Sequence, residues 1–205
     1  MDNEAESLVA RLSGVKESRL WGRRAIEGFL EGEEVLAIVS GIGKTNAASA
    51  AQLAIQHTGA KTLYNIGVAG GLEETMKVGD LYEVSRSVQY DFDLVAVNGG
   101  EMGTLNERDT PYFDCATTGA YPAKILGSGD RFNDDEKDYL LLRRLGAGLR
   151  DMEGAAIAHV CEKCGAGFMS LKCVSDVHGA GSTPGQYLEN LKKCLAILSS
   201  SRWPM

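Results

Sequence analysis

Apolar runs of strand length alternate along the chain with segments of helical periodicity. Residues 35–39 form one apolar run, residues 44–57 repeat their apolar positions at helical spacing, and residues 62–66 are apolar again. The alternation returns near the end, where residues 168–174 precede the helical pattern of residues 186–198. This order predicts an α/β fold in which helices cover a sheet.

The middle of the chain has a different pattern. Residues 78–97 read as longer and more polar strands, which favours a mixed and curved sheet. Residues 98–118 are rich in Gly, Asn, Asp and Thr, and we predict a mobile surface loop there. We find no internal repeat and no long linker, so one domain is expected over residues 1–205.

Composition narrows the class of protein. Hydrophobic residues make up 44% of the chain and charged residues 24%, as in globular proteins. The net charge of −7 comes without a basic cluster, which argues against nucleic acid as a partner. The acidic start does not resemble a signal peptide, and no run is long enough to span a bilayer, so we expect a cytoplasmic protein with no membrane partner.

The cysteines do not indicate a metal site or a disulfide framework. The five cysteines have no framework spacing, as expected where thiols stay reduced. Cys161 and Cys164 lack a second Cys or His pair at metal-ligand spacing, and we interpret them as ordinary helix-end residues. We interpret His159 as a core histidine and His178 as a residue at the rim of a site.

Two glycine-rich segments follow predicted strands. Residues 40–45 lead from a strand into a helix, where backbone N–H groups can hold an anion or a sugar oxygen. The nucleotide-triphosphate loop requires glycine where this chain has Ile38, so an ATPase is disfavoured. Residues 65–71 carry three glycines at the end of the next strand. Two interpretations remain: the two turns face one common ligand, or they are packing turns without a ligand.

Two carboxylates lie where the predicted elements change. Glu153 stands at the start of a helix whose later residues are small and apolar, so its burial begins there. A carboxylate at this place is often only a partner of the helix dipole. Asp176 follows the apolar run of residues 168–174, at the carboxyl end of a strand, where ligands of α/β proteins bind.

Taken together, the motifs resemble the nucleoside phosphorylase/nucleosidase superfamily, in particular its nucleosidases. The order and spacing of the motifs are more specific than any single one. The resemblance rests on Ser40-Gly41-Ile42-Gly43-Lys44, residues 65–71, Val78-Gly79-Asp80, Ser128-Gly129-Asp130-x-Phe132, Met152-Glu153-x-Ala155-Ala156-Ile157-Ala158 and Ser175-Asp176.

The resemblance implies a three-layer αβα sandwich with a central mixed, twisted sheet, a homodimer, and no metal or organic cofactor. It implies that Asp176 protonates the purine of a nucleoside substrate and that Glu153 binds the ribose. Phe132 would stack on the base. The implied substrate-binding positions are Met152, Phe132, Val68, Ala69, Gly70, Ser175, Lys172 and Gly43.

Hydrolysis and phosphorolysis differ in the nucleophile. Phosphorylases of the family tend to carry an arginine where this chain has Leu63-Tyr64-Asn65, so the resemblance favours water. The implied reaction is hydrolysis of a 5′-modified adenosine such as methylthioadenosine or S-adenosylhomocysteine. The water-activating glutamate of the family lies in Met-x-x-Glu, which assigns Glu4.

Three departures concern the same part of the site. Val68 stands where the nucleosidases usually have serine, and Lys172 where they have arginine. The strand and glycine turn that precede Met-x-x-Glu in the family are not in this sequence, so we expect an altered N-terminal region. A phosphorylase, a futalosine-type hydrolase and a non-catalytic nucleoside-binding protein remain alternatives.

Overall fold

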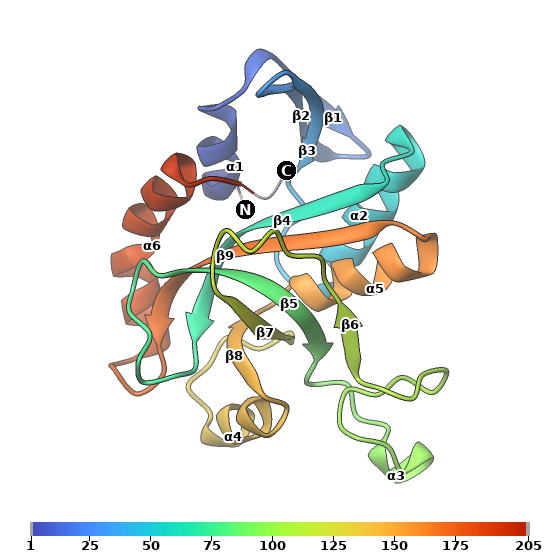
Figure 1. The fold of residues 1–205 in the computed structure, drawn as a ribbon, viewed down its shortest axis with the longest axis vertical. Coiled ribbons are helices and arrows are strands. Elements are labelled where there is room, and N and C mark those ends of the chain that lie inside the picture. Colours follow the sequence, from blue (N-terminus) through green and yellow to red (C-terminus); the bar gives the residue numbers. More distant parts are fainter. Residues whose placement is uncertain (1, 204–205) are drawn as a thin grey trace.

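The N-terminal part of the chain folds into a small antiparallel sheet in the computed structural model, which describes residues 2–203 (Figure 1). Its strands are β1 (Ser13–Leu20), β2 (Arg23–Leu30) and β3 (Glu33–Ile38). The two connecting turns have positive φ at both central positions, Trp21-Gly22 and Glu31-Gly32. This is the geometry of two-residue hairpins whose twist matches that of the strands.

The larger sheet is mixed and has six strands in the order β6-β5-β7-β8-β4-β9 within residues 2–203. Neighbours β4 and β9 are parallel, as are β5, β7 and β8, whereas β4–β8 and β5–β6 are antiparallel. The start of β5 also pairs with β9, so the sheet curls back on itself. The strands are β4 (Thr62–Gly71), β5 (Leu81–Gln89), β6 (Tyr112–Asp114), β7 (Ala123–Ser128), β8 (Ala147–Asp151) and β9 (Gly167–Val177).

Helices surround this sheet. Helix α6 packs against β9 and β4, while α5 packs against α2 and several strands on the other side of the view (Figure 1). The expected central mixed sheet with helices around it is therefore confirmed. Over residues 2–203, no helix is long and apolar enough to cross a membrane. The helices are α1 (Asp2–Val9), α2 (Lys44–Thr58), α3 (Val95–Asn98), α4 (Glu136–Arg144), α5 (Gly154–Cys164) and α6 (Thr183–Ser200).

The core lies where the most apolar strands meet. Leu126 of β7, Leu149 of β8 and Val174 of β9 are fully buried and pack together. Leu171 and Leu198 join β9 to α6 in a second cluster. The apolar positions of these strands thus form the core, while the polar residues near their ends, such as Asp151 and Asp176, reach the site.

Several predicted elements differ from those observed. Residues 35–39 overlap β3, but β3 belongs to the small sheet and pairs only with β2 among the described strands. Residues 65–71 lie within β4 and do not form a turn. Residues 78–97 contain β5 and the short helix α3, so the prediction of strands throughout was wrong there.

The predicted surface loop of residues 98–118 is also only partly a loop. Its residues 112–114 form β6, which pairs with β5. Leu105 and Phe113 are buried and pack against Ala158 and Cys161 of α5. A segment rich in turn-forming residues can still supply core side chains when a few apolar positions reach a neighbouring helix.

Candidate active site

A cavity of about 990 Å³ lies between the small sheet, β4, the end of β9 and the start of α5. It extends from the polar ends of these strands into an apolar region beside α2 and β3. Its polar part brings together side chains that are far apart in the sequence. That part is lined by Glu4, Val68, Ala69, Gly70, Phe132, Arg150, Asp151, Met152, Glu153, Lys172, Ser175, Asp176 and Tyr187.

Asp176 lies near the end of β9, opposite Gly70 of β4, and is 2% exposed. Its Oδ1 accepts a hydrogen bond from Ser175 Oγ (2.8 Å), whereas Oδ2 has no hydrogen-bond partner among the described residues. Burial raises the pKa of Asp176, and Ser175 and Arg150 oppose that rise. The side chain is thus a carboxyl group with one oxygen available for a ligand.

Glu153 is the N-terminal cap residue of α5, as the sequence indicated. Its Oε1 accepts the N–H of Gly43 (3.0 Å) and its Oε2 accepts the N–H of Met152 (3.3 Å). Burial and the neighbouring Asp151 carboxylate raise the pKa of Glu153. Gly43 has φ of 95° and does not line the cavity, so its N–H acts through Glu153 and direct contact with substrate stays a prediction.

Glu4 reaches the same cavity from α1. Its Oε1 accepts the N–H of Val68 (3.2 Å), across 64 positions of sequence. A Cβ on Gly67 would lie 2.5 Å from that oxygen, and a Cβ on Gly70 would lie 2.7 Å from Asp176 Oδ2. The glycines of β4 are therefore required by the close approach of two carboxylates. Met1, the first residue of the Met-x-x-Glu motif, lies outside the described residues.

Lys172 and Asp151 form a buried ion pair behind Glu153. Lys172 Nζ lies 3.0 Å from Asp151 Oδ2, and both side chains are 3% exposed. Asp151 Oδ1 accepts a hydrogen bond from Ser128 Oγ (2.5 Å) and from the N–H of Glu153 (3.2 Å). Burial alone would lower the pKa of Lys172, but Asp151, Glu153 and Glu4 outweigh it and raise that pKa. The lysine that replaces the arginine of the family is thus already paired.

We expect Lys172→Met to lower the free energy of unfolding by about 3 kcal/mol, because it leaves a buried carboxylate without its cation. The loss should lie at the low end for such pairs, since Asp151 keeps its hydrogen bonds from Ser128 and the start of α5. Urea denaturation of the wild type and the variant measures this difference in the free energy of unfolding.

Lys163→Met provides the matched control. Its ion pair with Glu107 spans 3.0 Å, but both side chains are about half exposed (52% and 53%), so the change should cost less than about 1 kcal/mol. Equal losses in the two variants would contradict a special role for the buried pair. The double variant Lys172→Met with Asp151→Asn should recover part of the loss, because the buried charge of Asp151 is removed together with its cation.

One side of the cavity is formed by a loop and by α6. Phe132 is half exposed, and its ring meets that of Tyr187 edge to face at 5.4 Å between centroids. The loop is held to the start of α2 because Asp130 Oδ1 accepts the N–H of Lys44 (2.8 Å), while Lys44 Nζ lies 2.5 Å from Asp91 Oδ1. The first glycine segment and the Phe132 loop are therefore joined.

Most residues predicted for the site line this one cavity, with Gly43 as the exception. Ser175 and Ala69 are buried; Ser175 holds Asp176, and Ala69 lies on β4 beside Val68. Sequence reasoning missed several polar lining residues, among them Arg150, Asp151 and Tyr187. The Arg150-Asp151 pair directly before Met152 was a usable signal, since adjacent charges at a strand end require partners.

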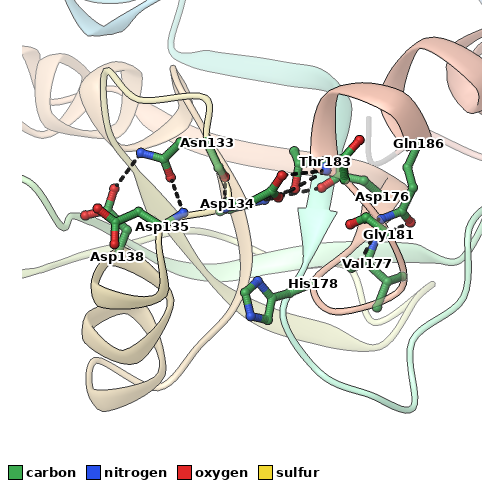
Figure 2. Close-up of polar contacts among 12 residues, drawn as sticks. Asn133, Asp134, Asp135, Asp138, Asp176, Val177, His178, Gly181, Thr183 and Gln186 are labelled. Carbon is green, nitrogen blue, oxygen red and sulfur yellow. Dashed lines mark hydrogen bonds and ion pairs between the residues drawn. The ribbon is translucent and has the colours of Figure 1, made fainter.

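The two histidines considered in the sequence, His159 and His178, are both partly buried. The ring of His159 stacks on the buried Phe113 at 4.9 Å, and the rim position of His178 stays a prediction. His178 stacks on Tyr139 at 3.7 Å and does not line the cavity, and Figure 2 shows it beside the loops around Asp176. Over residues 2–203 there is no group of three or more His, Cys, Asp or Glu side chains placed to hold a metal ion.

Comparison with known proteins places these residues in a family context. The family model of the phosphorylase superfamily matches residues 1–200. The 5′-methylthioadenosine/S-adenosylhomocysteine nucleosidase of Halalkalibacterium halodurans is 34% identical over 194 residues, which cover 88% of this chain and 84% of that protein.

Solved structures are similar over nearly the whole chain. The nucleosidase of the same name from Colwellia psychrerythraea, in complex with adenine, superposes with a TM-score of 0.90 at 28% identity, covering 97% of this chain and 88% of that one. The enzyme from Neisseria meningitidis, in complex with methylthio-immucillin-A, gives 0.88 at 28% identity, covering 97% and 92%.

Proposed function

This chain belongs to the phosphorylase superfamily, and we propose that it is a purine nucleoside N-ribosyl hydrolase acting on a 5′-modified adenosine such as methylthioadenosine or S-adenosylhomocysteine. The observation that carries the proposal is the convergence of Asp176, Glu153 and Glu4 on one cavity. Cleavage of an N-glycosidic bond requires an acid for the base, a group that favours positive charge on the sugar, and a nucleophile.

Asp176 is the proposed acid. Its Oδ2 is buried, accepts no hydrogen bond within the described residues and lies 3.6 Å from Arg150 Nη2, so it can still meet the N7 atom of a purine. As the C1′–N9 bond breaks, the base takes the bonding electron pair and N7 receives the proton from Asp176. Burial favours the protonated form of the carboxyl group, which suits a proton donor.

Glu153 is the proposed partner of the sugar. The N–H groups of Gly43 and Met152 hold its carboxylate at the start of α5. There it can accept hydrogen bonds from the ribose hydroxyls and stabilise the oxocarbenium character that develops at C1′. A fixed carboxylate in a site shielded from water is more effective for this than one in solvent.

The charges around Glu4 favour water over phosphate as the nucleophile. Glu4 accepts a hydrogen bond from the N–H of Val68 and lies near Glu153 and Lys172. The ammonium of Lys172 is already paired with Asp151. Among the described residues, the carboxylates of Asp151, Glu153 and Glu4 all act on Lys172, and such a gathering of negative charge is unfavourable for a phosphate dianion. Water adds to C1′ and passes a proton to Glu4, which completes the hydrolysis.

The proposal also covers assembly and location. We infer a homodimer in the cytoplasm, where residues 98–118 of one protomer help to select the 5′ substituent of the substrate bound by the other. This is supported by the absence of residues 98–118 from the lining of their own cavity and by the exposed Val97 of α3 (76%). Sedimentation of the purified protein tests the dimer.

The function is tested by detecting free base by chromatography. The protein is incubated with methylthioadenosine, S-adenosylhomocysteine, adenosine, inosine and futalosine, each with and without phosphate. We expect release of adenine from the first two without phosphate. Release that depends on phosphate, with formation of a sugar 1-phosphate, would make the protein a phosphorylase, and tight binding without release would make it a binding protein.

A further inference from the structure

Arg150 of β8 connects two segments that lie on either side of the proposed acid. Its Nη1 donates to the carbonyl oxygen of Asn133 (2.8 Å), and its Nη2 donates to Thr183 Oγ1 (2.5 Å). The same Nη2 lies 3.6 Å from Asp176 Oδ2. The side chain is 12% exposed, so these contacts are made away from bulk water.

A second contact reinforces the connection. Thr183 is the first residue of α6, and both carboxylate oxygens of Asp134 accept a hydrogen bond from its N–H (3.1 Å each; Figure 2). The hydrogen bonds from Thr183 lower the pKa of Asp134, so that carboxyl group remains charged. Arg150 Nη2 lies 3.9 Å from Asp134 Oδ1 and adds a favourable charge interaction.

The connected segments carry the residues that enclose the base. Residues 129–135 include Phe132, and α6 supplies Tyr187, whose ring Phe132 contacts. The distance between this loop and α6 therefore determines where Phe132 lies relative to Asp176. Arg150 is the described side chain that bonds to both segments and also approaches the acid.

We propose that Arg150 is a positioning residue that holds the loop of residues 129–135 to the start of α6 across Asp176, so that the base-stacking ring and the proton donor are aligned. This inference rests on the proposed function for its catalytic consequence. It adds a residue that the family motifs quoted above do not include. Gly70 is part of the same arrangement, because a Cβ there would lie 2.9 Å from Arg150 Nε and 2.7 Å from Asp176 Oδ2.

Arg150 also acts on the charge of Asp176. Burial raises the pKa of Asp176, and the guanidinium opposes that rise because it favours the carboxylate. Removing the positive charge should therefore raise this pKa further. The charged or titratable groups that face Asp176 are Arg150 from β8, Asp134 from the loop before α4, and Tyr187 and Cys194 from α6.

The test compares Arg150→Met, Arg150→Lys and Arg143→Met. Arg143 of α4 donates to the carbonyl oxygen of Ala147 in β8 (3.1 Å) and lies 3.8 Å from Glu73. It is therefore an arginine that also contacts β8 but does not line the cavity. We expect Arg150→Met to lower kcat about tenfold or more, with a smaller change in KM. Arg143→Met should leave both near the wild-type values.

The pH profile separates positioning of the acid from a general loss of structure. Activity that needs protonated Asp176 falls as pH rises through its pKa. In Arg150→Met this alkaline limb of kcat/KM should move to higher pH by about one unit, whereas Arg150→Lys keeps the charge and should keep the limb. A lower rate with an unmoved limb in Arg150→Met would overturn the proposal.

Amide hydrogen exchange provides a readout that does not depend on turnover. Both Arg150 variants should show faster exchange in residues 129–135 and at the start of α6, and Arg143→Met should not. If the wild type releases no base, the proposed function fails while exchange still decides whether Arg150 holds the loop. Unchanged exchange in both Arg150 variants would overturn the inference. If Arg150→Met does not fold, hydrogen exchange of Arg150→Lys alone decides the inference.

Discussion

Asp176→Asn is expected to lower kcat by about 10²–10⁴-fold while weakening ligand binding far less. Asparagine keeps the shape of the side chain and can still accept the hydrogen bond of Ser175, which spans 2.8 Å. It has no proton to give to the leaving base. Steady-state turnover, together with calorimetric binding of adenine, measures the two quantities separately.

Asp93→Asn is the control for this substitution. Asp93 precedes α3, is exposed, and lies outside the lining of the cavity. It should leave turnover and binding unchanged. Equal losses of turnover and of affinity in Asp176→Asn would count against Asp176 as the acid, because removal of a group used only in the transition state lowers kcat selectively.

Glu153→Gln should lower kcat/KM by about 10²–10³-fold. The amide oxygen of glutamine can still accept the N–H of Gly43, so the start of α5 keeps one of its links to residues 40–45. The negative charge that favours an oxocarbenium ion is lost, and so is an acceptor for the ribose hydroxyls. Initial rates at several substrate concentrations give kcat and KM.

Binding of two ligands distinguishes this variant from Asp176→Asn. Glu153→Gln should weaken a stable nucleoside analogue but leave free adenine nearly unaffected, because adenine lacks the sugar. Glu17→Gln is the control, since Glu17 is about half exposed, pairs with Arg24 on the small sheet and does not line the cavity. Equal weakening of analogue and free base in Glu153→Gln would place Glu153 at the base and not at the sugar.

Several elements could be predicted from the sequence because their signals are local. The helix predicted at residues 44–57 is α2 (Lys44–Thr58), with Gly59 in the left-handed conformation at its end. Glu153 at the start of α5 and Asp176 near the end of β9 were located by the change from one periodicity to another. Short-range pattern is sufficient for such positions.

The partners of those elements were not predictable in the same way. The run at residues 35–39 has the apolar character of a buried central strand, yet β3 pairs with β2 in a separate antiparallel sheet. The glycines of residues 65–71 were interpreted as a turn, whereas β4 continues through them in pairing with β9 and β8, and the missing Cβ atoms of Gly67 and Gly70 leave room for Glu4 and Asp176. Strand pairing depends on distant segments, which periodicity does not report.

By itself the sequence determined the approximate positions of α2, β9 and α6, and that Glu153 and Asp176 stand near the ends of elements. Only the tertiary structure decided what each carboxylate meets. Gly43 reaches Glu153 across 110 positions and Val68 reaches Glu4 across 64, and the Asp151–Lys172 pair and the contacts of Arg150 arise in the same way. The physical reason is that local preferences act within a few residues, while buried charges take their partners from whatever segments the packed core brings beside them.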